Sequence, residues 1–513
     1  MFYVPLYIEG LRSRPVLVFW LATLAQAAVW FLVPLLFYAA PPGDLAKVLA
    51  TGREVPLDGA FGPPLAYWLA EIAFRAAGLF GVYALSQVCV IATYWCVFAL
   101  GRPIVGAAHA AMAVLLMVGI SVFTVPTPEF GPSTLAMALW AAALLFYWRA
   151  IGQKRREYWY AFGGAAALLL ITSDAAFILV GALIVFTAIT RRGRMAADTF
   201  EAWVAAAVVV GMVFVHFLLV ERAGVELTPT LERLRSAASA GANTAAWLWL
   251  LGALVVAHAG LAVLLVLAEG WPRMRTDPPP AIARAPVDPF ASLFVKAFAI
   301  WPALLATIIA VLAGNRLPIG GVAPLLVLSG LAVVIAAGDS IELRHPRALG
   351  FAWAGLLVVP AIFVPIVIVL LPWTTGTELK VAQPATAIGR YFGESFMRRT
   401  GHPLAIVSGD ARLAELVAIA APSRPSVYFA ADPAHSPWVS AADIRDKGAV
   451  VVWRAPDTNP APPPEIKAQF PDLIPEVPRT FERPVRGRLP PLLIGWGVIR
   501  PASAPAPANA PPH

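Results

Sequence analysis

The chain has 513 residues, of which 59% are hydrophobic and only 13% are charged. Because about 25% charged residues are usual in soluble globular proteins, this composition excludes an ordinary soluble enzyme and predicts a polytopic membrane protein. The net charge of +8 does not indicate a nucleic-acid partner, since most cations lie in short loops where membrane orientation accounts for them.

Long apolar runs recur from Pro15 to Trp373. A helix needs about 20 apolar residues to cross roughly 30 Å of hydrocarbon, which predicts about eleven crossings here. In chain order these spans cover 15–39, 79–100, 103–124, 133–149, 159–172, 174–190, 200–220, 244–268, 291–313, 322–337 and 351–371. The sequence therefore predicts a mainly α transmembrane bundle over residues 1–373.

Basic residues are concentrated on every second loop. One set of loops holds Arg12, Arg14, Arg102, Arg149, Lys154, Arg155, Arg156, Arg191, Arg192, Arg194, Arg273, Arg275, Arg284, Arg344 and Arg347. The opposite set holds only Lys47, Arg53, Arg75, Arg222, Arg233, Arg235 and Arg316. Because positive loops stay in the cytoplasm, we expect a bacterial inner-membrane protein with a cytoplasmic N-terminus. Loop 41–78 and everything after Pro372 are then periplasmic.

The segment 159–190 supports this topology. As one helix it would be about 48 Å long, too long for a single crossing. Both of its flanks are basic, which requires an even number of crossings. We therefore predict a hairpin whose tip, Thr172-Ser173-Asp174, lies at the outer interface. The segment before Pro15 has no small-residue cleavage site, so the first span is expected to remain uncleaved.

The composition changes after Trp373. Helices are expected at 382–399, 411–421 and 441–447, and strands at 403–408, 426–430 and 449–453. This alternation predicts a small periplasmic α/β domain with a parallel sheet over residues 374–500. It carries no glycine-rich nucleotide motif. The Pro/Ala-rich tail 501–513 is expected to be disordered.

Loop 41–78 is the first candidate for chemistry, because connectors this long in a tightly looped protein are usually functional. Its pattern predicts two surface helices, 43–51 and 63–77, with an apolar stripe that includes Leu65, Trp68, Leu69 and Ile72. A carboxylate can take a proton from an acceptor hydroxyl, and cations can neutralise a phosphate leaving group. The candidates are Asp44 as the base, and Lys47, Arg53, Glu54, Asp58 and Arg75 as substrate-binding residues; Glu71 lies among them.

Glu129 is a second candidate base, in the outer loop Val125-Pro126-Thr127-Pro128-Glu129-Phe130-Gly131-Pro132. Its three prolines stiffen the connection. Simpler roles remain open: Asp44 as a helix N-cap, Glu129 as a hydrated interfacial charge, and the loop cations as contacts to lipid headgroups. The sequence has no D-x-D motif and only two cysteines, so we expect no metal and no cofactor.

The chain resembles the membrane glycosyltransferases of family 39. The resemblance covers roughly residues 10–370 and rests on the long first outer loop, the phrase Pro63-Pro64-Leu65-Ala66-Tyr67-Trp68-Leu69, and the run 134–150 ending LLFYWRA. Family 39 and its relatives include lipid A aminoarabinose transferases, protein O-mannosyltransferases and rhizobial lipopolysaccharide glycosyltransferases. The resemblance implies a C-type membrane fold, a polyprenyl-phosphate-linked sugar donor, and an acidic catalytic base in the first outer loop.

One departure bears on activity. Where the family usually has an acidic pair after the first span, this chain has Phe37, Tyr38 and Ala39, and Asp44 is the first acid.

We expect transfer of a sugar to a periplasmic lipid or glycan acceptor such as a lipopolysaccharide component. Membrane lipids are expected to surround the bundle. The alternatives are a catalytically silent relative and a lipid or glycan transporter or flippase. The spans lack the intramembrane carboxylates that transporters commonly need.

Overall fold

The computed structural model describes residues 6–54, 62–222, 240–269, 280–313, 319–429 and 436–502. Candidate Asp58 and residues 503–513 of the tail lie outside this set. The chain forms two compact units. The first comprises Met1–Leu35, Phe61–Ala66 and Phe80–Phe363, and the second comprises Leu36–Ala60, Tyr67–Leu79 and Val364–His513. The domain boundaries near 373 and 500 remain predictions.

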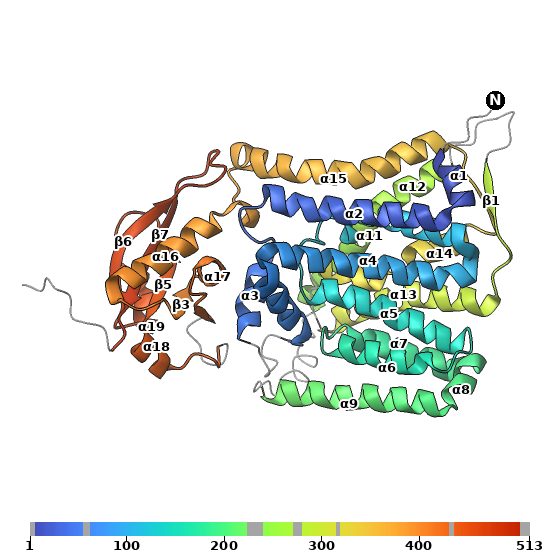
Figure 1. Ribbon diagram of the computed structural model, residues 1–513, viewed down its shortest axis with the longest axis horizontal. Coiled ribbons are helices and arrows are strands. Elements are labelled where there is room, and N and C mark those ends of the chain that lie inside the picture. The colour runs from blue at the N-terminus through green and yellow to red at the C-terminus, as the bar shows by residue number, and fades with distance from the viewer. Residues whose placement is uncertain are drawn as a thin grey trace, which may run out of the picture. The chain divides into compact units, whose positions relative to one another are not determined.

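The first unit is a bundle of helices (Figure 1). Its elements are α1 (Leu6–Ser13), α2 (Pro15–Phe37), α4 (Leu65–Met117), η1 (Ser121–Phe123), α5 (Pro132–Ile151), α6 (Tyr158–Leu170), α7 (Ala176–Ile189), α8 (Arg191–Ala197), α9 (Phe200–Arg222), α11 (Ala240–Ala257), α12 (Ala259–Glu269), α13 (Pro289–Ala313), η2 (Ile319–Leu326), α14 (Ser329–Ala336) and α15 (Pro346–Thr374). A short antiparallel pair, β1 (Ala281–Ala283) with β2 (Ser340–Glu342), was not predicted. α2, α4 and α15 extend beyond this unit.

The protein is a multi-pass membrane protein. Within the described residues six helices are long and apolar enough to cross a membrane, or up to eight if each bent pair is one span. The predicted fold class, a mainly helical membrane bundle with a small C-terminal α/β region, is confirmed. The number of about eleven crossings remains a prediction.

Helix α4 has 53 residues, about 80 Å if straight, far more than one crossing needs. It changes direction at two glycines with left-handed backbone, Gly78 (φ 60°) and Gly106 (φ 81°). A Cβ built on Gly101 would lie 3.2 Å from the Ala110 Cβ, so the chain folds back across Gly106. These turns lie close to the boundaries predicted for the surface helix 63–77 and for the spans 79–100 and 103–124. Glycine takes this conformation without the steric cost of a side chain.

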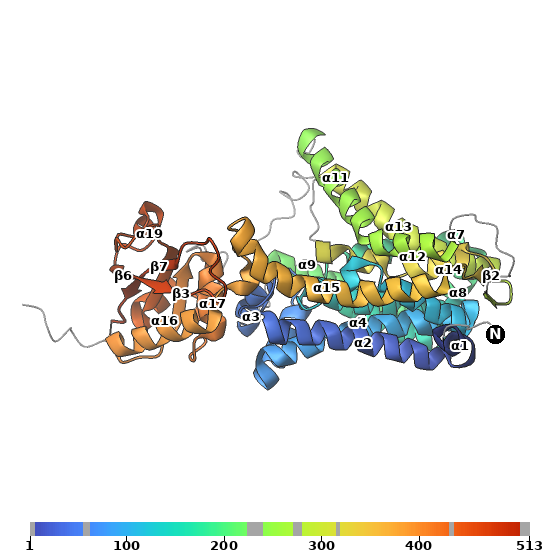
Figure 2. The same ribbon diagram turned by 90° about the horizontal axis from the view of Figure 1, so that it is seen from above.

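Two predicted spans are interrupted. The span 244–268 is a pair of helices, α11 and α12, bent by 41° at His258, and Figure 2 shows α11 turning away from α12. The span 322–337 is divided into the 3-10 segment η2, which contains Pro324, and the short helix α14. Proline has no amide hydrogen to donate, and this favours such a break. Neither run is therefore one continuous helix, and a single crossing for each remains a prediction.

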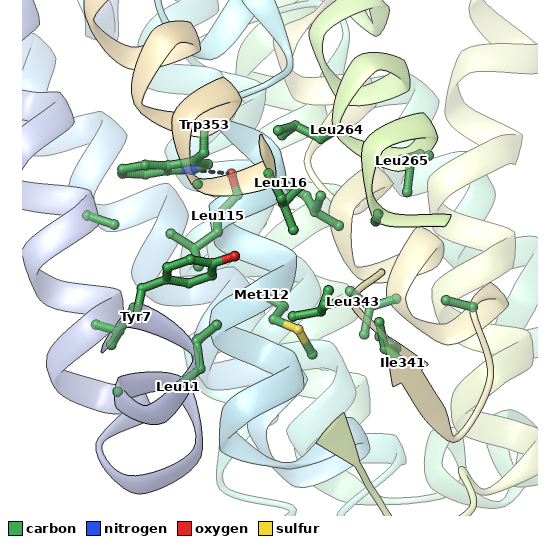
Figure 3. A pocket seen from close by; sticks show the side chains of 18 of the residues that line it. Tyr7, Leu11, Met112, Leu115, Leu116, Leu264, Leu265, Ile341, Leu343 and Trp353 are labelled. Carbon is green, nitrogen blue, oxygen red and sulfur yellow. Dashed lines mark hydrogen bonds between the residues drawn. The ribbon is translucent and has the colours of Figure 1, made fainter. Parts of the chain in front are cut away.

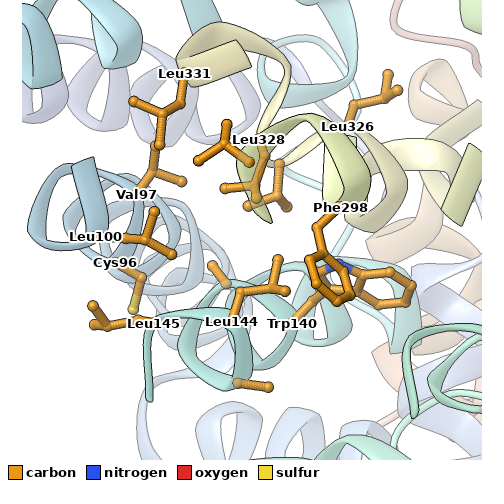
Figure 4. Close-up of a cluster of buried hydrophobic side chains, with 14 of the residues drawn as sticks. Cys96, Val97, Leu100, Trp140, Leu144, Leu145, Phe298, Leu326, Leu328 and Leu331 are labelled. Atoms are coloured by element: carbon orange, nitrogen blue, oxygen red, sulfur yellow. The ribbon is translucent and has the colours of Figure 1, made fainter. Parts of the chain in front are cut away.

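The core of the bundle is apolar and lies between α4, α5, α13, η2 and α14. Figure 4 shows side chains from these elements meeting, including Leu100, Trp140, Leu144, Phe298 and Leu331. All five are at most 1% exposed. Since lipid is as apolar as these side chains, close packing rather than the hydrophobic effect holds such helices together.

The second unit contains a five-stranded sheet in the order β4-β3-β5-β7-β6. Its strands are β3 (Ile406–Gly409), β4 (Ser426–Tyr428), β5 (Ala449–Arg454), β6 (Ile474–Phe481) and β7 (Leu492–Ile499), and its helices are α3 (Leu45–Arg53), α16 (Ala385–Thr400), α17 (Ala411–Ala420), α18 (Ala441–Lys447) and α19 (Pro464–Gln469), with η3 (Lys380–Ala382). The predicted parallel part, β4-β3-β5, is present.

Strands β6 and β7 were missed, and both add antiparallel pairs to the sheet. β6 contains Pro475 and Pro478 and forms an edge, where proline is tolerated. β7 contains Gly495 and Gly497, which pack under Trp453 and Leu473. Prolines and glycines lower the strand signal of a sequence, which accounts for the omission.

A close crossing of two glycines predicts a sensitive position in the bundle. A Cβ on Gly260 would lie 2.6 Å from the Gly119 carbonyl oxygen, next to the hydrogen bond from the Leu261 amide to that oxygen. We expect Gly260→Ala to destabilise the protein by about 1–3 kcal/mol through overpacking, seen as a lower melting temperature in detergent. Gly252→Ala is the matched control, because a Cβ there meets nothing within 4 Å. Equal melting temperatures for the two variants would contradict this packing.

Candidate active site

Asp44 occupies the N-cap position of α3, but its side chain makes no capping hydrogen bond. The simple reading of Asp44 as a helix cap is therefore wrong. Its carboxylate instead accepts a hydrogen bond from Lys380 Nζ at 3.1 Å and is largely exposed. The exposed carboxylate can accept a proton from a hydroxyl, and the neighbouring ammonium of Lys380 can attract an anion such as phosphate.

The backbone that carries Asp44 is held by Arg412 of α17. The Arg412 guanidinium donates to the carbonyl oxygens of Pro41 (2.9 Å) and Gly43 (3.4 Å). It also donates to the Lys380 carbonyl oxygen at 3.3 Å. One planar, permanently charged group thus ties together the segments that carry Asp44 and Lys380.

Glu415, one helical turn after Arg412, lies buried among charged groups. Burial raises the pKa of Glu415 to about 7, although Arg412, Lys47 and Lys380 act in the opposite direction. Lys47 is half-buried, and its positive charge interacts with the Glu415 carboxyl group. The same charge is available to a substrate. The result is a carboxyl group that changes its charge near neutral pH beside the Asp44 loop.

A second charged cluster surrounds Glu71 in the first segment of α4. Glu71 is buried, and its two carboxylate oxygens accept hydrogen bonds from Arg424 at 2.8 and 2.9 Å. Arg75 binds the same carboxylate at 2.7 Å. The Arg424 guanidinium also lies 4.5 Å from the centre of the Phe74 ring. This bidentate pair joins the surface helix to the turn before β4.

Arg424 has a left-handed backbone with φ 48°, a conformation that costs a non-glycine residue of order 1–3 kcal/mol. The two hydrogen bonds to Glu71 and the contact with Phe74 hold Arg424 in this conformation. Arg53 and Glu54, at the end of α3, lie beside the pair, and burial lowers the pKa of Arg53. Gly52 allows this approach, because a Cβ there would lie 2.5 Å from the Tyr67 carbonyl oxygen.

The structure thus gathers most candidates of loop 41–78 into two places in the second unit. Asp44 and Lys47 lie near Lys380, Arg412 and Glu415, whereas Arg53, Glu54 and Arg75 lie near Glu71 and Arg424. The sequence analysis missed Lys380, Arg412, Glu415 and Arg424, which come from the C-terminal part of the chain. No motif marks them, and only the fold brings them to the loop.

Glu129 belongs to the first unit. Its amide donates to the Pro126 carbonyl oxygen at 3.0 Å, and its own carbonyl oxygen accepts from the Thr134 hydroxyl at 2.9 Å. These bonds make the loop before α5 rigid, as its prolines predicted. A site shared by Glu129 and Asp44 remains a prediction.

An apolar cavity of about 1140 Å³ lies in the first unit, lined by α1, α2, α4, α12, α14 and α15. Figure 3 shows Leu11, Met112, Leu115, Leu264 and Trp353 around it. The Trp353 indole donates to the Leu115 carbonyl oxygen at 3.0 Å and fixes one wall. A cavity of this size and lining suits a hydrocarbon chain.

The buried pair predicts a large loss of stability when one partner is removed. Arg424→Met leaves Glu71 buried with fewer donors, which typically costs about 3–5 kcal/mol. Arg390→Met is the matched control, because its pair with Glu394 is exposed and exposed pairs contribute little to stability. Thermal denaturation of both variants in detergent tests this, and similar small losses would argue against the buried pair.

The raised pKa of Glu415 predicts a pH-dependent contribution to stability. The folded state holds the proton more tightly than the unfolded state, so stability falls as pH rises from about 4.5 towards 7. Glu415→Gln removes this dependence. Between pH 5 and pH 8 its free energy of unfolding is expected to fall by about 2–3 kcal/mol less than that of the wild type. Parallel melting curves at both pH values check this, and identical pH profiles would refute it.

Comparison with known proteins supports the predicted resemblance. Residues 62–219 match the family model described as dolichyl-phosphate-mannose-protein mannosyltransferase. ArnT from Cupriavidus metallidurans bound to undecaprenyl phosphate aligns over 96% of this chain and 99% of its own, with TM-score 0.56 and 14% identity. The apo state of ArnT gives TM-score 0.55 at 14% identity over the same shares.

The oligosaccharyltransferase from Archaeoglobus fulgidus in its apo form aligns over 86% of this chain and 69% of its own, with TM-score 0.46 and 12% identity. No curated protein matches the sequence. At such identities the ArnT structures establish a shared fold, and the family match covers residues 62–219. The chain therefore has the C-type glycosyltransferase fold, and its resemblance to the family 39 membrane glycosyltransferases is confirmed.

Proposed function

We propose that this protein is a membrane glycosyltransferase that moves one sugar from a polyprenyl-phosphate donor to an envelope acceptor, such as a lipopolysaccharide component or a related glycan. The observation that carries the proposal is the family match over residues 62–219 in a chain with the ArnT fold. ArnT binds undecaprenyl phosphate in one of these structures, which supports a lipid-linked donor here. Transfer on the periplasmic face of the inner membrane is part of the proposal.

In the proposed reaction Asp44 takes the proton of the acceptor hydroxyl, whose oxygen then attacks the anomeric carbon. The bond from that carbon to the phosphate oxygen breaks, and the polyprenyl phosphate leaves with the electron pair. Lys380, 3.1 Å from Asp44, is well placed to neutralise the leaving phosphate. Lys47 is a second cation for the same purpose.

Glu129 is the alternative base, and Arg53, Glu54, Asp58 and Arg75 complete the proposed substrate-binding set. Two of these have a structural role as well, because Arg75 binds Glu71 and Arg53 lies beside Arg424. We therefore expect substitutions at Arg53 and Arg75 to lower stability together with activity. Lys47 and Lys380 are the better tests of phosphate binding.

The silent-relative alternative also has an observation in its favour. The place of the family's acidic pair is taken by Phe37, Tyr38 and Ala39, and Asp44 is engaged with Lys380. A protein without transfer activity could still hold a lipid-linked sugar. Sugar transfer by the wild-type protein distinguishes an active glycosyltransferase from a silent relative.

Substitution of the two candidate bases tests the proposal. Asp44→Asn keeps the shape of the side chain but removes proton acceptance, and loss of a general base typically lowers the rate about 10²–10⁴-fold. We expect this loss for Asp44→Asn and a smaller effect for Glu129→Gln. Transfer is measured in liposomes that contain purified protein, a polyprenyl-phosphate sugar and a lipopolysaccharide acceptor.

Asp410→Asn is a suitable control for the Asp44 variant. Asp410 caps α17 through the Leu413 amide, and Asn caps helices as well as Asp. If Asp44→Asn and Glu129→Gln both kept the full rate, neither residue would be the base. If the wild type itself transferred no sugar from a range of donors, the silent-relative reading would replace the proposal.

A further inference from the structure

A polar cavity of about 630 Å³ lies in the first unit, separate from the apolar cavity of Figure 3. Its walls come from the fold-back of α4 at Gly106, the end of α5, and the segment that follows β1. The polar side chains that line it are Arg102, His109, Gln153, Arg284 and Asp288, together with the indole of Trp148. By the predicted topology this is the cytoplasmic end of the bundle.

Three of these lining side chains have a buried nitrogen without a hydrogen-bond partner among the described residues. The atoms are His109 Nε2, Trp148 Nε1 and Arg284 Nη1. The indole and guanidinium nitrogens can only donate, whereas the imidazole nitrogen donates or accepts according to its protonation. A buried donor without an acceptor is unfavourable because its desolvation is not offset, so a native structure normally supplies an acceptor, water or an ion.

Arg284 is held in a fixed orientation. Its Nε and Nη2 donate to the Gly338 carbonyl oxygen at 3.2 and 2.9 Å, and Nη2 also donates to the Ile335 carbonyl oxygen at 3.4 Å. Its side chain is 4% exposed, and Asp339 lies 3.5 Å from Nη2. The remaining nitrogen, Nη1, is therefore preorganised for an additional acceptor.

The charges around the cavity favour an anion. The carboxylate of Asp288 is already bound to Arg192 at 2.5 Å and to the Phe290 amide. Arg102 is exposed on the wall and forms no ion pair within the described part of the chain. Arg102 thus contributes a positive charge that none of the described residues balances. The ion pair between Arg284 and Asp339, at 3.5 Å, is longer than the pair between Arg192 and Asp288.

We propose that this cavity binds a phosphate group, held by Arg102, Arg284 and the neighbouring His109 and Trp148. Phosphate offers several acceptor oxygens and a negative charge, which match a donor-rich cavity where the charge of Arg102 is unbalanced and Arg284 Nη1 has no acceptor among the described residues. The group belongs either to the headgroup of an anionic membrane lipid or to a free phosphate ion. This site differs from the proposed sugar-transfer site and does not depend on it.

Two binding measurements on the purified, delipidated full chain distinguish the sources. Native mass spectrometry compares phosphatidic acid with diacylglycerol, which has the same tails without phosphate. Isothermal titration with inorganic phosphate tests the free ion. Preference for phosphatidic acid supports a lipid headgroup, and binding of inorganic phosphate supports a free anion.

The variants Arg102→Gln and Arg284→Gln are expected to weaken this binding about tenfold or more, because each removes a charge-assisted contact. Arg102 is exposed, so Arg102→Gln keeps the test valid if Arg284→Gln fails to fold. Arg191→Gln is the control: it removes one charge from an exposed residue of α8 that does not line the cavity. No phosphate-dependent binding in either measurement, or equal weakening by the control, would overturn the proposal.

Discussion

The buried ion pair between Glu71 and Arg424 is the interaction on which the second unit most depends. It joins the second surface helix of loop 41–78, at the start of α4, to the α/β part of the chain, across 353 residues of sequence. A buried carboxylate is tolerated only when donors satisfy it, and here Arg424 supplies two hydrogen bonds and Arg75 a third. Arg412 adds a second link, because its guanidinium donates to the backbone carbonyl oxygens of Pro41 and Gly43. The candidate base is thus carried on a loop whose geometry is set by distant arginines.

This dependence explains what the sequence could and could not predict. Apolar runs of 20 residues and a change of composition after Trp373 have direct physical signatures, so most helices, three strands and α3 were predicted near their observed positions. The interruptions at His258 and Pro324 escaped prediction because hydropathy measures apolar character and not continuity of hydrogen bonding. Strands β6 and β7 escaped because their prolines and glycines are tolerated by tertiary contacts.

The candidate site shows the same division. The acids and cations of loop 41–78 pointed to Asp44, Lys47 and Arg53, because a connector of this length is unusual in a tightly looped chain. Lys380, Arg412, Glu415 and Arg424 were missed, since isolated charged residues in an α/β segment have many ordinary roles and form no motif. Asp44 was weighed as a helix cap, yet its side chain binds Lys380 instead. Only the tertiary structure distinguishes these roles.

The central claim is that the protein handles a sugar donor carried on a polyprenyl phosphate. Lipid extraction from the gently purified full chain, followed by liquid chromatography and mass spectrometry, tests it most directly. We expect polyprenyl phosphate, free or sugar-linked, to be enriched in the extract over its level in the surrounding membrane. Extracts that contain only bulk phospholipids in membrane proportions, even after addition of polyprenyl phosphate, would contradict it.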